Sequence, residues 1–369
     1  MIPVAKPSIT RLENKFVRKA VKSSWVGSKG FYLEAATEAF SEVCGTKHVS
    51  LVSNGTVAIH LALLALGVTE GDEVIVPNFT YVAVANSVKY CGAIPQFCEV
   101  DPVSWNLDTK KLKDLISVKT KAIIVVNTFG RIADFVEIRH ILKGIHREDI
   151  KIIEDASQSH MAKINGKVSG SFGDISTFSF FANKIITAGE GGAVCSDNEE
   201  YILKVNYLKN QALKPNNENY FYFPNVGFNY RLNNLSAAIL YAQIIRRRRL
   251  QSKRIEIYET YISELENCEI ITLQSKETSV DIAPWLFPIK LNVGAKLSRN
   301  EIIKSLNRLG IETRPFFHPL NRLPQFNFNS EIDNGVSYEL SKYGINLPTF
   351  VDLKSNQIKL ISNSLLKLI

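Results

Sequence analysis

An aspartate and a lysine near the middle of the chain are the residues best suited to chemistry. Asp155 follows the short run Ile-Ile-Glu at residues 152–154, and Lys184 follows a stretch rich in Phe, Ser and Thr. A glycine cluster at residues 189–192 comes next. A strand-end acid and a lysine amine suit pyridoxal phosphate, because the acid keeps the pyridinium nitrogen protonated and the amine holds the aldehyde as a Schiff base. The alternative is an acid and a surface lysine that share no purpose.

A second candidate lies at residues 53–56, Ser-Asn-Gly-Thr, between an expected strand and an expected helix. The free N–H groups at a helix N-terminus bind anions, and Gly55 permits close approach. The alternative is an ordinary helix start capped by Asn54 or Thr56.

Apolar, β-rich runs alternate with helical patterns between residues 48 and 195. This alternation predicts an α/β fold with a layered sheet, and the continuous apolar run at 122–126 is typical of a strand covered on both faces. The expected strands are 48–53, 73–76, 94–97, 122–126, 152–154, 175–180 and 193–195, and the expected helices are 56–66, 81–90 and 135–142.

The chain after about residue 252 predicts a smaller α+β domain. Residues 254–265 and 298–309 show helical patterns, the second with Ser298 as its cap and Gly310 after its end, and 285–291 is an expected strand. We therefore expect a large domain at 1–250, with an N-terminal segment that contacts substrate, and a small C-terminal domain at 251–369. Residues 211–226 are expected to form a loop.

Composition limits the classes of function. The 369 residues carry a net charge of +8 and are 45% hydrophobic, without a run long enough to cross a membrane. The N-terminus lacks an apolar signal core, and the five scattered cysteines show no CxxC spacing, which predicts a cytoplasmic protein without a disulfide framework or metal site. Four arginines at 246–249, followed by Lys253 and Arg254, predict a solvated or interface helix face, since no nucleic-acid-binding motif accompanies them.

Six blocks of sequence, in order, resemble the DegT/DnrJ/EryC1/StrS family of sugar aminotransferases. They include residues 53–56, 71–77, 154–160, 189–192 and 227–231, with Lys184. The resemblance implies pyridoxal-phosphate fold type I, with a three-layer αβα large domain around a mixed, mostly parallel sheet. It also implies transamination of a nucleotide-linked keto sugar, an internal aldimine on Lys184, a pyridoxamine-phosphate intermediate, and a homodimer with shared active sites.

Matching positions give each residue a role. Lys184 and Asp155 are the expected catalytic pair. Lys184 occupies a position where related dehydratases have histidine, which favours amination over dehydration. An aromatic at Tyr81 stacks on the pyridine ring in the family, and Asn229 reaches the neighbouring subunit's phosphate; without the family, Tyr81 is a core aromatic and Asn229 a turn residue. The expected cofactor contacts are Gly55, Thr56, Tyr81, Asp155, Gln158, Ser179, Lys184 and Asn229.

Blocks at 25–30, 179–187 and 311–317 resemble a subgroup that aminates C4 of GDP-4-keto-6-deoxymannose, with glutamate as donor, for cell-surface glycans. The chain departs from that pattern at Asn127, Asn321 and 157–160, where the sugar or donor is expected to be read. A dTDP- or UDP-linked keto sugar, a sugar dehydratase and a non-catalytic nucleotide-sugar-binding regulator remain alternatives. Expected substrate contacts are Trp25, Lys29, His160, Asn183, Arg231, Arg314 and His318, with a structural role as the alternative for His160.

Overall fold

Within the part of the chain that the structure describes, the main sheet has seven strands, and one of them runs against the rest. The computed structural model describes residues 1–214, 221–274, 280–326 and 335–369. The strand order is β1-β9-β8-β5-β4-β2-β3, with β9 antiparallel to both of its neighbours and the other pairs parallel. The strands are β1 (His48–Val52), β2 (Glu73–Pro77), β3 (Ile94–Cys98), β4 (Thr120–Val126), β5 (Lys151–Asp155), β8 (Ile175–Ser179) and β9 (Gly192–Ser196).

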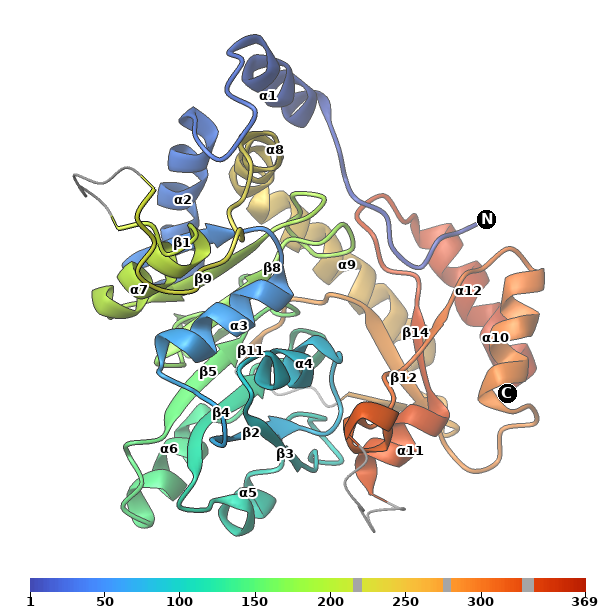
Figure 1. Ribbon diagram of the computed structural model, residues 1–369. Helices are drawn as coiled ribbons and strands as arrows, with labels where there is room; N and C mark the ends of the chain where they lie inside the picture. The colour runs from blue at the N-terminus through green and yellow to red at the C-terminus, as the bar shows by residue number, and fades with distance from the viewer. Residues whose placement is uncertain (215–220, 275–279, 327–334) are drawn as a thin grey trace.

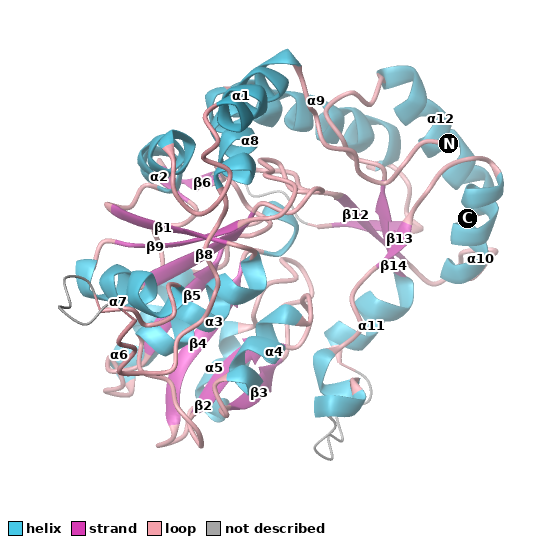
Figure 2. Cartoon of the chain, turned by 45° about the horizontal axis from the view of Figure 1, so that its top comes forward, coloured by secondary structure: helices cyan, strands magenta, loops and turns pink. Residues whose placement is uncertain are grey.

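Helices cover both faces of this sheet, which confirms the expected three layers (Figures 1 and 2). Alternate residues of β4 enter two separate cores: Ile123 and Val125 face one, and Ile124 and Val126 face the other. On one face lie α3 (Gly55–Ala65), α4 (Ala83–Tyr90) and α7 (Glu199–Lys209). On the other lie α1 (Arg11–Lys22), α2 (Phe31–Cys44), α5 (Thr109–Leu115), α6 (Phe135–Gly144) and α8 (Asn234–Ile245).

A second, antiparallel sheet forms the core of the C-terminal part. Its order is β10-β12-β14-β13, and its strands are β10 (Ile271–Leu273), β12 (Phe287–Leu291), β13 (Arg314–Pro315) and β14 (Gly344–Leu347). Its core is shared with α9 (Arg247–Leu265), α10 (Arg299–Arg308) and α12 (Ser355–Leu368). The remaining elements are β6 (Lys163–Ile164), β7 (Lys167–Val168), β11 (Val280–Asp281), α11 (Val336–Tyr343) and the 3₁₀ turns η1 (Thr128–Gly130), η2 (Leu320–Arg322) and η3 (Pro324–Phe326).

A single boundary in the sequence does not separate the large part, with the seven-stranded sheet, from the small part, with the antiparallel sheet. The expected boundary after residue 250 falls inside α9, which contributes to both cores. The first residues belong with the second sheet: Ile2 pairs with Ile311, and the Thr349 N–H donates to the Val4 carbonyl at 2.9 Å. The chain therefore begins in the small part, builds the large one and returns (Figure 1).

Most expected elements are present, and their ends have the expected chemistry. Ser298 caps α10 in a capping box with Glu301, and Gly310 follows with a φ of +77°. Asn54 rather than Thr56 caps α3, its Oδ1 accepting from the Val57 N–H at 3.0 Å. The expected loop at 211–226 lies partly outside the described residues.

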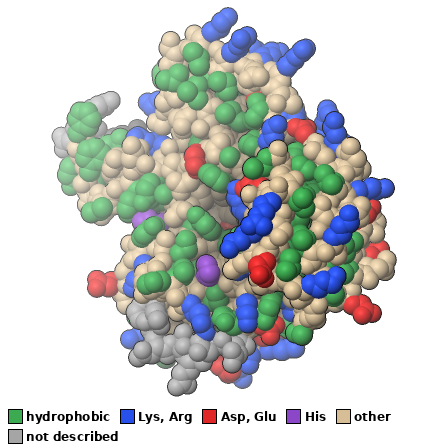
Figure 3. All heavy atoms as spheres, turned by 90° about the vertical axis from the view of Figure 1, so that its right-hand side faces the viewer, with side chains coloured by type: hydrophobic (Ala, Val, Ile, Leu, Met, Phe, Trp, Pro, Cys, Tyr) green, Lys and Arg blue, Asp and Glu red, His purple; other side chains and the backbone are tan. Residues whose placement is uncertain are grey.

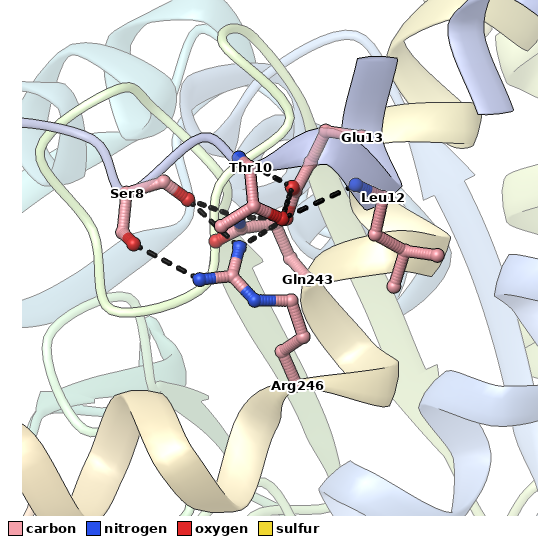
Figure 4. Close-up of polar contacts among 6 residues, drawn as sticks. All are labelled: Ser8, Thr10, Leu12, Glu13, Gln243 and Arg246. Atoms are coloured by element: carbon pink, nitrogen blue, oxygen red, sulfur yellow. Dashed lines mark hydrogen bonds and ion pairs between the residues drawn. The ribbon is translucent and has the colours of Figure 1, made fainter. Parts of the chain in front are cut away.

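The arginine run is only partly solvated. Arg248 and Arg249 are exposed, as expected, but Arg246 pairs with the carboxylate of Glu13, which is 1% exposed. Glu13 also accepts from the Thr10 N–H and the Gln243 amide, both at 2.7 Å (Figure 4). Burial alone would raise the pKa of Glu13, but these partners outweigh it and lower the pKa. The network fastens the N-terminal segment to the junction of α8 and α9.

The surface carries charge of both signs. On the face in Figure 3, Lys and Arg side chains are interspersed with acidic and hydrophobic ones and form no continuous stripe. Among the residues that the structure describes, no helix combines the length and the apolar character needed to cross a bilayer.

Candidate active site

The candidate residues converge where strands β5, β8 and β1 end. Asp155 is the last residue of β5, Ser179 is the last of β8, and Gly55 begins the helix that follows β1. These three strands run in the same direction, because β9 is antiparallel to both β1 and β8. Their carboxyl ends therefore meet at one edge of the sheet, where α/β folds bind ligands.

Asp155 is an acid in a desolvated place. It is 5% exposed, and its Oδ1 accepts from the Ser157 N–H at 3.0 Å. Burial raises its pKa, while hydrogen bonds from Ser157 and the charge of Lys184 act in the other direction. Such a carboxylate would be stabilised by a cation, which is what a protonated pyridine nitrogen supplies.

Lys184 lies in the turn that follows β8, with its backbone N–H donating to the Phe181 carbonyl at 2.9 Å. Its ammonium lies over the Trp285 ring, 3.8 Å from the centroid. Burial lowers the pKa of Lys184 to about 8; Asp155 opposes this effect and the Arg254 charge adds to it. A lysine with such a pKa has a substantial neutral fraction near neutrality, as a nucleophile and proton carrier requires.

An anion cradle is built where α3 begins. The N–H groups of Gly55 and Thr56 belong to the first turn, where the helix itself offers no acceptors. A Cβ at residue 55 would lie 2.8 Å from the Ser179 Cβ, so only glycine lets the helix start approach the end of β8 this closely. The Ser179 hydroxyl and the helix N-terminus can therefore hold the same phosphate.

Two further side chains, Tyr81 and Gln158, are candidates for contacts to the ring of a bound cofactor. Tyr81 is 59% exposed, and its ring lies 6.3 Å from that of Phe317. Gln158 is buried, and its Oε1 accepts from the Phe129 N–H at 2.8 Å. This bond engages the amide oxygen, so the NH₂ group is the part of the side chain that can donate to a ligand. Together with Asp155 and the cradle, these residues fit a ligand that has a phosphate and a cationic ring nitrogen.

His160 is better described by the structural alternative than by a substrate contact. It is 1% exposed, its ring packs against Phe178 and Phe180, and its Nδ1 accepts from the Ile186 N–H at 3.3 Å. Burial lowers the pKa of His160 to about 3, with Lys184 adding to the effect, so the ring is neutral at physiological pH. A sugar has no access to a side chain this deeply buried.

Asn127 does not contact a sugar or donor as expected, because its side chain is fully buried. Its Nδ2 donates to Glu154 at 2.8 Å, to Ser159 at 3.1 Å and to Ser169 at 3.0 Å. Glu154 in turn accepts from the N–H groups of residues 170 and 172 at 2.7 and 2.8 Å. This network supports the segment that carries Asp155 and Gln158 from behind. Asn321 is likewise buried, and its backbone N–H donates to Asn78 Oδ1 at 3.0 Å.

Other expected contacts lie at the outer edge of the sheet. Asn229 Oδ1 accepts from the Arg231 Nη2 at 2.8 Å, and Arg231 pairs with Val52 of β1. Lys29 and Arg231 line a cavity of about 590 Å³ bounded by α2, β1 and the end of α7. Within one chain, this cavity is separate from the group around Lys184.

The last expected contacts are near the open side and the second sheet. Trp25 is 58% exposed. Arg314 pairs with Glu312 at 3.3 Å on β13, and His318 is exposed shortly after it. Asn183 precedes Lys184, and its buried Oδ1 has no hydrogen-bond partner in the described structure.

Sequence reasoning missed two residues at the site, Trp285 and Arg254. Arg254 was expected on a solvated or interface face of a helix, but it is 2% exposed inside the chain and donates to the Trp285 and Thr349 carbonyls. Its spacing from the buried Ile257 and Tyr261 places it on the inner face of α9, which is a usable signal. Trp285 gives no local signal, because its partner is distant in the sequence.

Comparisons with known proteins identify the family and the fold. A family model described as the DegT/DnrJ/EryC1/StrS aminotransferase family matches residues 7–366. The chain is similar to the GDP-perosamine synthase of Caulobacter vibrioides, with 39% identity over 97% of this chain and 95% of that protein. The GDP-perosamine synthase of Vibrio cholerae is 38% identical over 98% of each. The fold matches the PLP-form of a putative sugar aminotransferase from Streptococcus pneumoniae, with a TM-score of 0.93 and 24% identity over 100% of this chain and 99% of that one.

Proposed function

The chain belongs to the DegT/DnrJ/EryC1/StrS aminotransferase family, and from that premise we propose that it aminates C4 of GDP-4-keto-6-deoxymannose to give GDP-perosamine, with glutamate as amino donor. The enzyme is an aminotransferase that uses pyridoxal 5′-phosphate. The GDP-linked sugar is favoured by the two GDP-perosamine synthases, which align with nearly the whole chain. The net charge of +8 suits a diphosphate-bearing substrate through long-range attraction.

The observation that carries the proposal is the pair formed by the buried Asp155 and the half-buried Lys184 beside the anion cradle. When bound, the cofactor supplies a carbonyl that exchanges the amine and a ring that accepts electrons. Asp155 holds the proton on the ring nitrogen, and Ser179 with the first turn of α3 holds the phosphate. Lys184 Nζ would take the proton from the α-carbon of glutamate in the first half of the exchange and would deliver a proton to C4 of the sugar in the second half.

The aromatic residues below the site keep water away from this chemistry. Phe79, Trp105 and Phe129 of the large part pack with Trp285 and Phe316 of the small part, and all five are buried. Burial makes the charge interactions at Asp155 and Lys184 stronger than they would be in water. We assign the binding of the sugar and nucleotide to Trp25, Lys29, Asn183, Arg231, Arg314 and His318, acting in the site of their own chain or in that of a second subunit.

A homodimer with shared sites forms part of the proposal. Trp25, Phe31, Phe221 and Tyr222 are all more than half exposed. The Trp25 carbonyl is bonded to Asn234, so the N-terminal loop lies against the segment that carries Asn229. Large exposed aromatic side chains are typical of a subunit interface. Asn229 would then reach the phosphate of the neighbouring subunit. The proposed setting is the cytoplasm, and the product would serve O-antigen lipopolysaccharide or another cell-surface glycan.

The test is product analysis with a panel of substrates. The purified protein is incubated with glutamate and GDP-, dTDP- or UDP-linked 4-keto-6-deoxy sugars, with Lys184→Ala protein as the matched control. We expect a 4-amino sugar, detected by mass spectrometry, with the GDP substrate and the wild-type protein only. A preference for dTDP or UDP would overturn the assigned nucleotide. A deoxygenated product would indicate a dehydratase, and binding without an absorbance band from the bound cofactor would indicate a non-catalytic protein.

A further inference from the structure

The indole of Trp285 contacts both Lys184 and the residue before it. The Lys184 ammonium lies 3.8 Å from the centroid of the ring, and the indole N–H donates to the Asn183 carbonyl at 3.0 Å. One ring therefore contacts the reacting nitrogen through its face and the backbone that carries it through its edge. Trp285 comes from the segment that enters β12, so this contact joins the small part of the chain to the catalytic turn.

The ring is itself held in place from behind. The guanidinium of Arg254 donates to the Trp285 carbonyl and, at 3.0 Å, to the Thr349 carbonyl. The ring of Phe129 stacks on the indole with centroids 6.2 Å apart and an interplanar angle of 21°. Trp285 is 6% exposed. Its orientation is therefore fixed by α9, by η1 and by the Asn183 carbonyl together.

Among the described residues, the charges that act on Lys184 come from Asp155 and Arg254. Asp155 attracts the ammonium, and Arg254 repels it. His160 is neutral because burial lowers its pKa to about 3. Once Asp155 is paired with a protonated ring nitrogen, it is less able to stabilise the ammonium. The π face of Trp285 then supplies the favourable contact for the cation, an interaction that strengthens where water is excluded.

We propose that Trp285 is a positioning residue that holds the free ammonium of Lys184 on its indole face, ready for proton transfer. The inference rests on the proposed function, because a free Lys184 amine arises in the reaction only when it leaves the cofactor. The contact joins only residues of this chain, so it can be tested in protein from which the cofactor has been removed.

The experiment is trace labelling of the apo-protein with acetic anhydride across a pH series. Mass spectrometry of the Lys184 peptide gives the pH midpoint at which the amine becomes reactive. Lys209 serves as an internal control, since it is held by Ser50 and Leu51 and its pKa is lowered by burial to a similar value, about 8. Trp285→Leu, which removes the π face but fills most of its volume, should lower the Lys184 midpoint by about one pH unit. Trp285→Phe, which keeps a weaker π face, should lower it less.

An unchanged or raised Lys184 midpoint in Trp285→Leu, with Lys209 unaffected, would overturn the proposal. Equal shifts in the Leu and Phe variants would do the same, because a purely structural effect does not follow π character. If the Leu variant does not fold, Trp285→Phe decides alone, through a lowered midpoint or an unchanged one. Labelling does not involve the cofactor or the sugar, so failure of the product assay would refute the proposed function and leave this test valid.

Discussion

Glu13 and Asp155 are two carboxylates in nearly equal burial, 1% and 5% exposed, but their pKa values shift in opposite directions. Glu13 meets the Arg246 guanidinium and the Gln243 amide, which belong to the same chain. Asp155 accepts a hydrogen bond from the Ser157 N–H, and the charge of Lys184 acts on it electrostatically without a direct ion pair. A buried acid with its own cation fastens the fold, whereas one without a cation in contact is suited to a ligand that brings the charge.

The largest expected effect is that of Lys184→Ala. Turnover should fall by at least about 10⁴-fold, because the lysine is both the nucleophile and the proton carrier. The fold should remain, since no ion pair of the described structure depends on this amine. Steady-state kinetics and thermal unfolding measure the two effects. More than a few per cent of wild-type transamination would contradict the mechanism.

Asp155→Asn should lower kcat/KM, with a loss of about 3–5 kcal/mol of transition-state stabilisation, because the ring nitrogen loses its charge partner. The apo-protein should be at least as stable as the wild type at neutral pH. The folded-state pKa of Asp155 is raised above 3.8, so ionisation above that pKa disfavours the folded state and Asn removes this penalty. A large loss of stability in the apo-protein together with only a small fall in kcat/KM would contradict this account. It would mean that Asp155 stabilises the fold, which is the role assigned to Glu13.

Arg246→Met is the complementary change. It should reduce the free energy of unfolding by about 3–5 kcal/mol, because it leaves Glu13 buried without its cation, while kcat per folded molecule is retained. A double-mutant cycle with Glu13→Gln isolates the pair. In the wild type the folded-state pKa of Glu13 lies below 4.5, so its stabilisation is complete above that pH and is lost as the pH falls further. If the coupling energy that this cycle measures between Glu13 and Arg246 stayed the same from pH 5 to pH 3, the stabilising role assigned to the ionised Glu13 would be contradicted.

A smaller effect is expected for Asn229→Ala. Cofactor affinity should fall by about 1–2 kcal/mol if the amide bonds the neighbouring subunit's phosphate. Mixing this variant with Lys184→Ala protein should restore activity in part, because one site of the heterodimer then carries both lesions and the other carries neither. With subunit exchange confirmed by two different tags, an absence of recovery would refute the shared site.

Local sequence patterns predicted the residues at the centre of the candidate site but not those that surround them. Asp155, Gly55 and Lys184 stand next to strand and helix boundaries, where composition and spacing are informative. Trp285 lies about a hundred residues from Lys184, and no local pattern predicts so distant a contact.

The errors have similar physical causes. Arg254 was grouped with its basic neighbours, although its spacing from Tyr261 puts it on the buried face of α9. Asn127 was expected to lie where the sugar or the amino donor is read, whereas its amide is hydrogen-bonded to Glu154 and to two serines that come later in the chain. The mixed sheet was expected from the family resemblance and is confirmed, but which strand is reversed was not predicted, because a strand's residues do not encode its partner's direction.

The central claim is that Asp155 is reserved for the cationic ring of the cofactor while Glu13 is not. The most direct measurement is the rise in Tm that pyridoxal phosphate produces in wild-type, Asp155→Asn and Glu13→Gln proteins, since a ligand stabilises in proportion to its affinity for the folded state. We predict the same rise in wild type and Glu13→Gln, from a lower starting Tm in the latter, and a much smaller rise in Asp155→Asn. A rise in Asp155→Asn equal to that of the wild type would contradict the account.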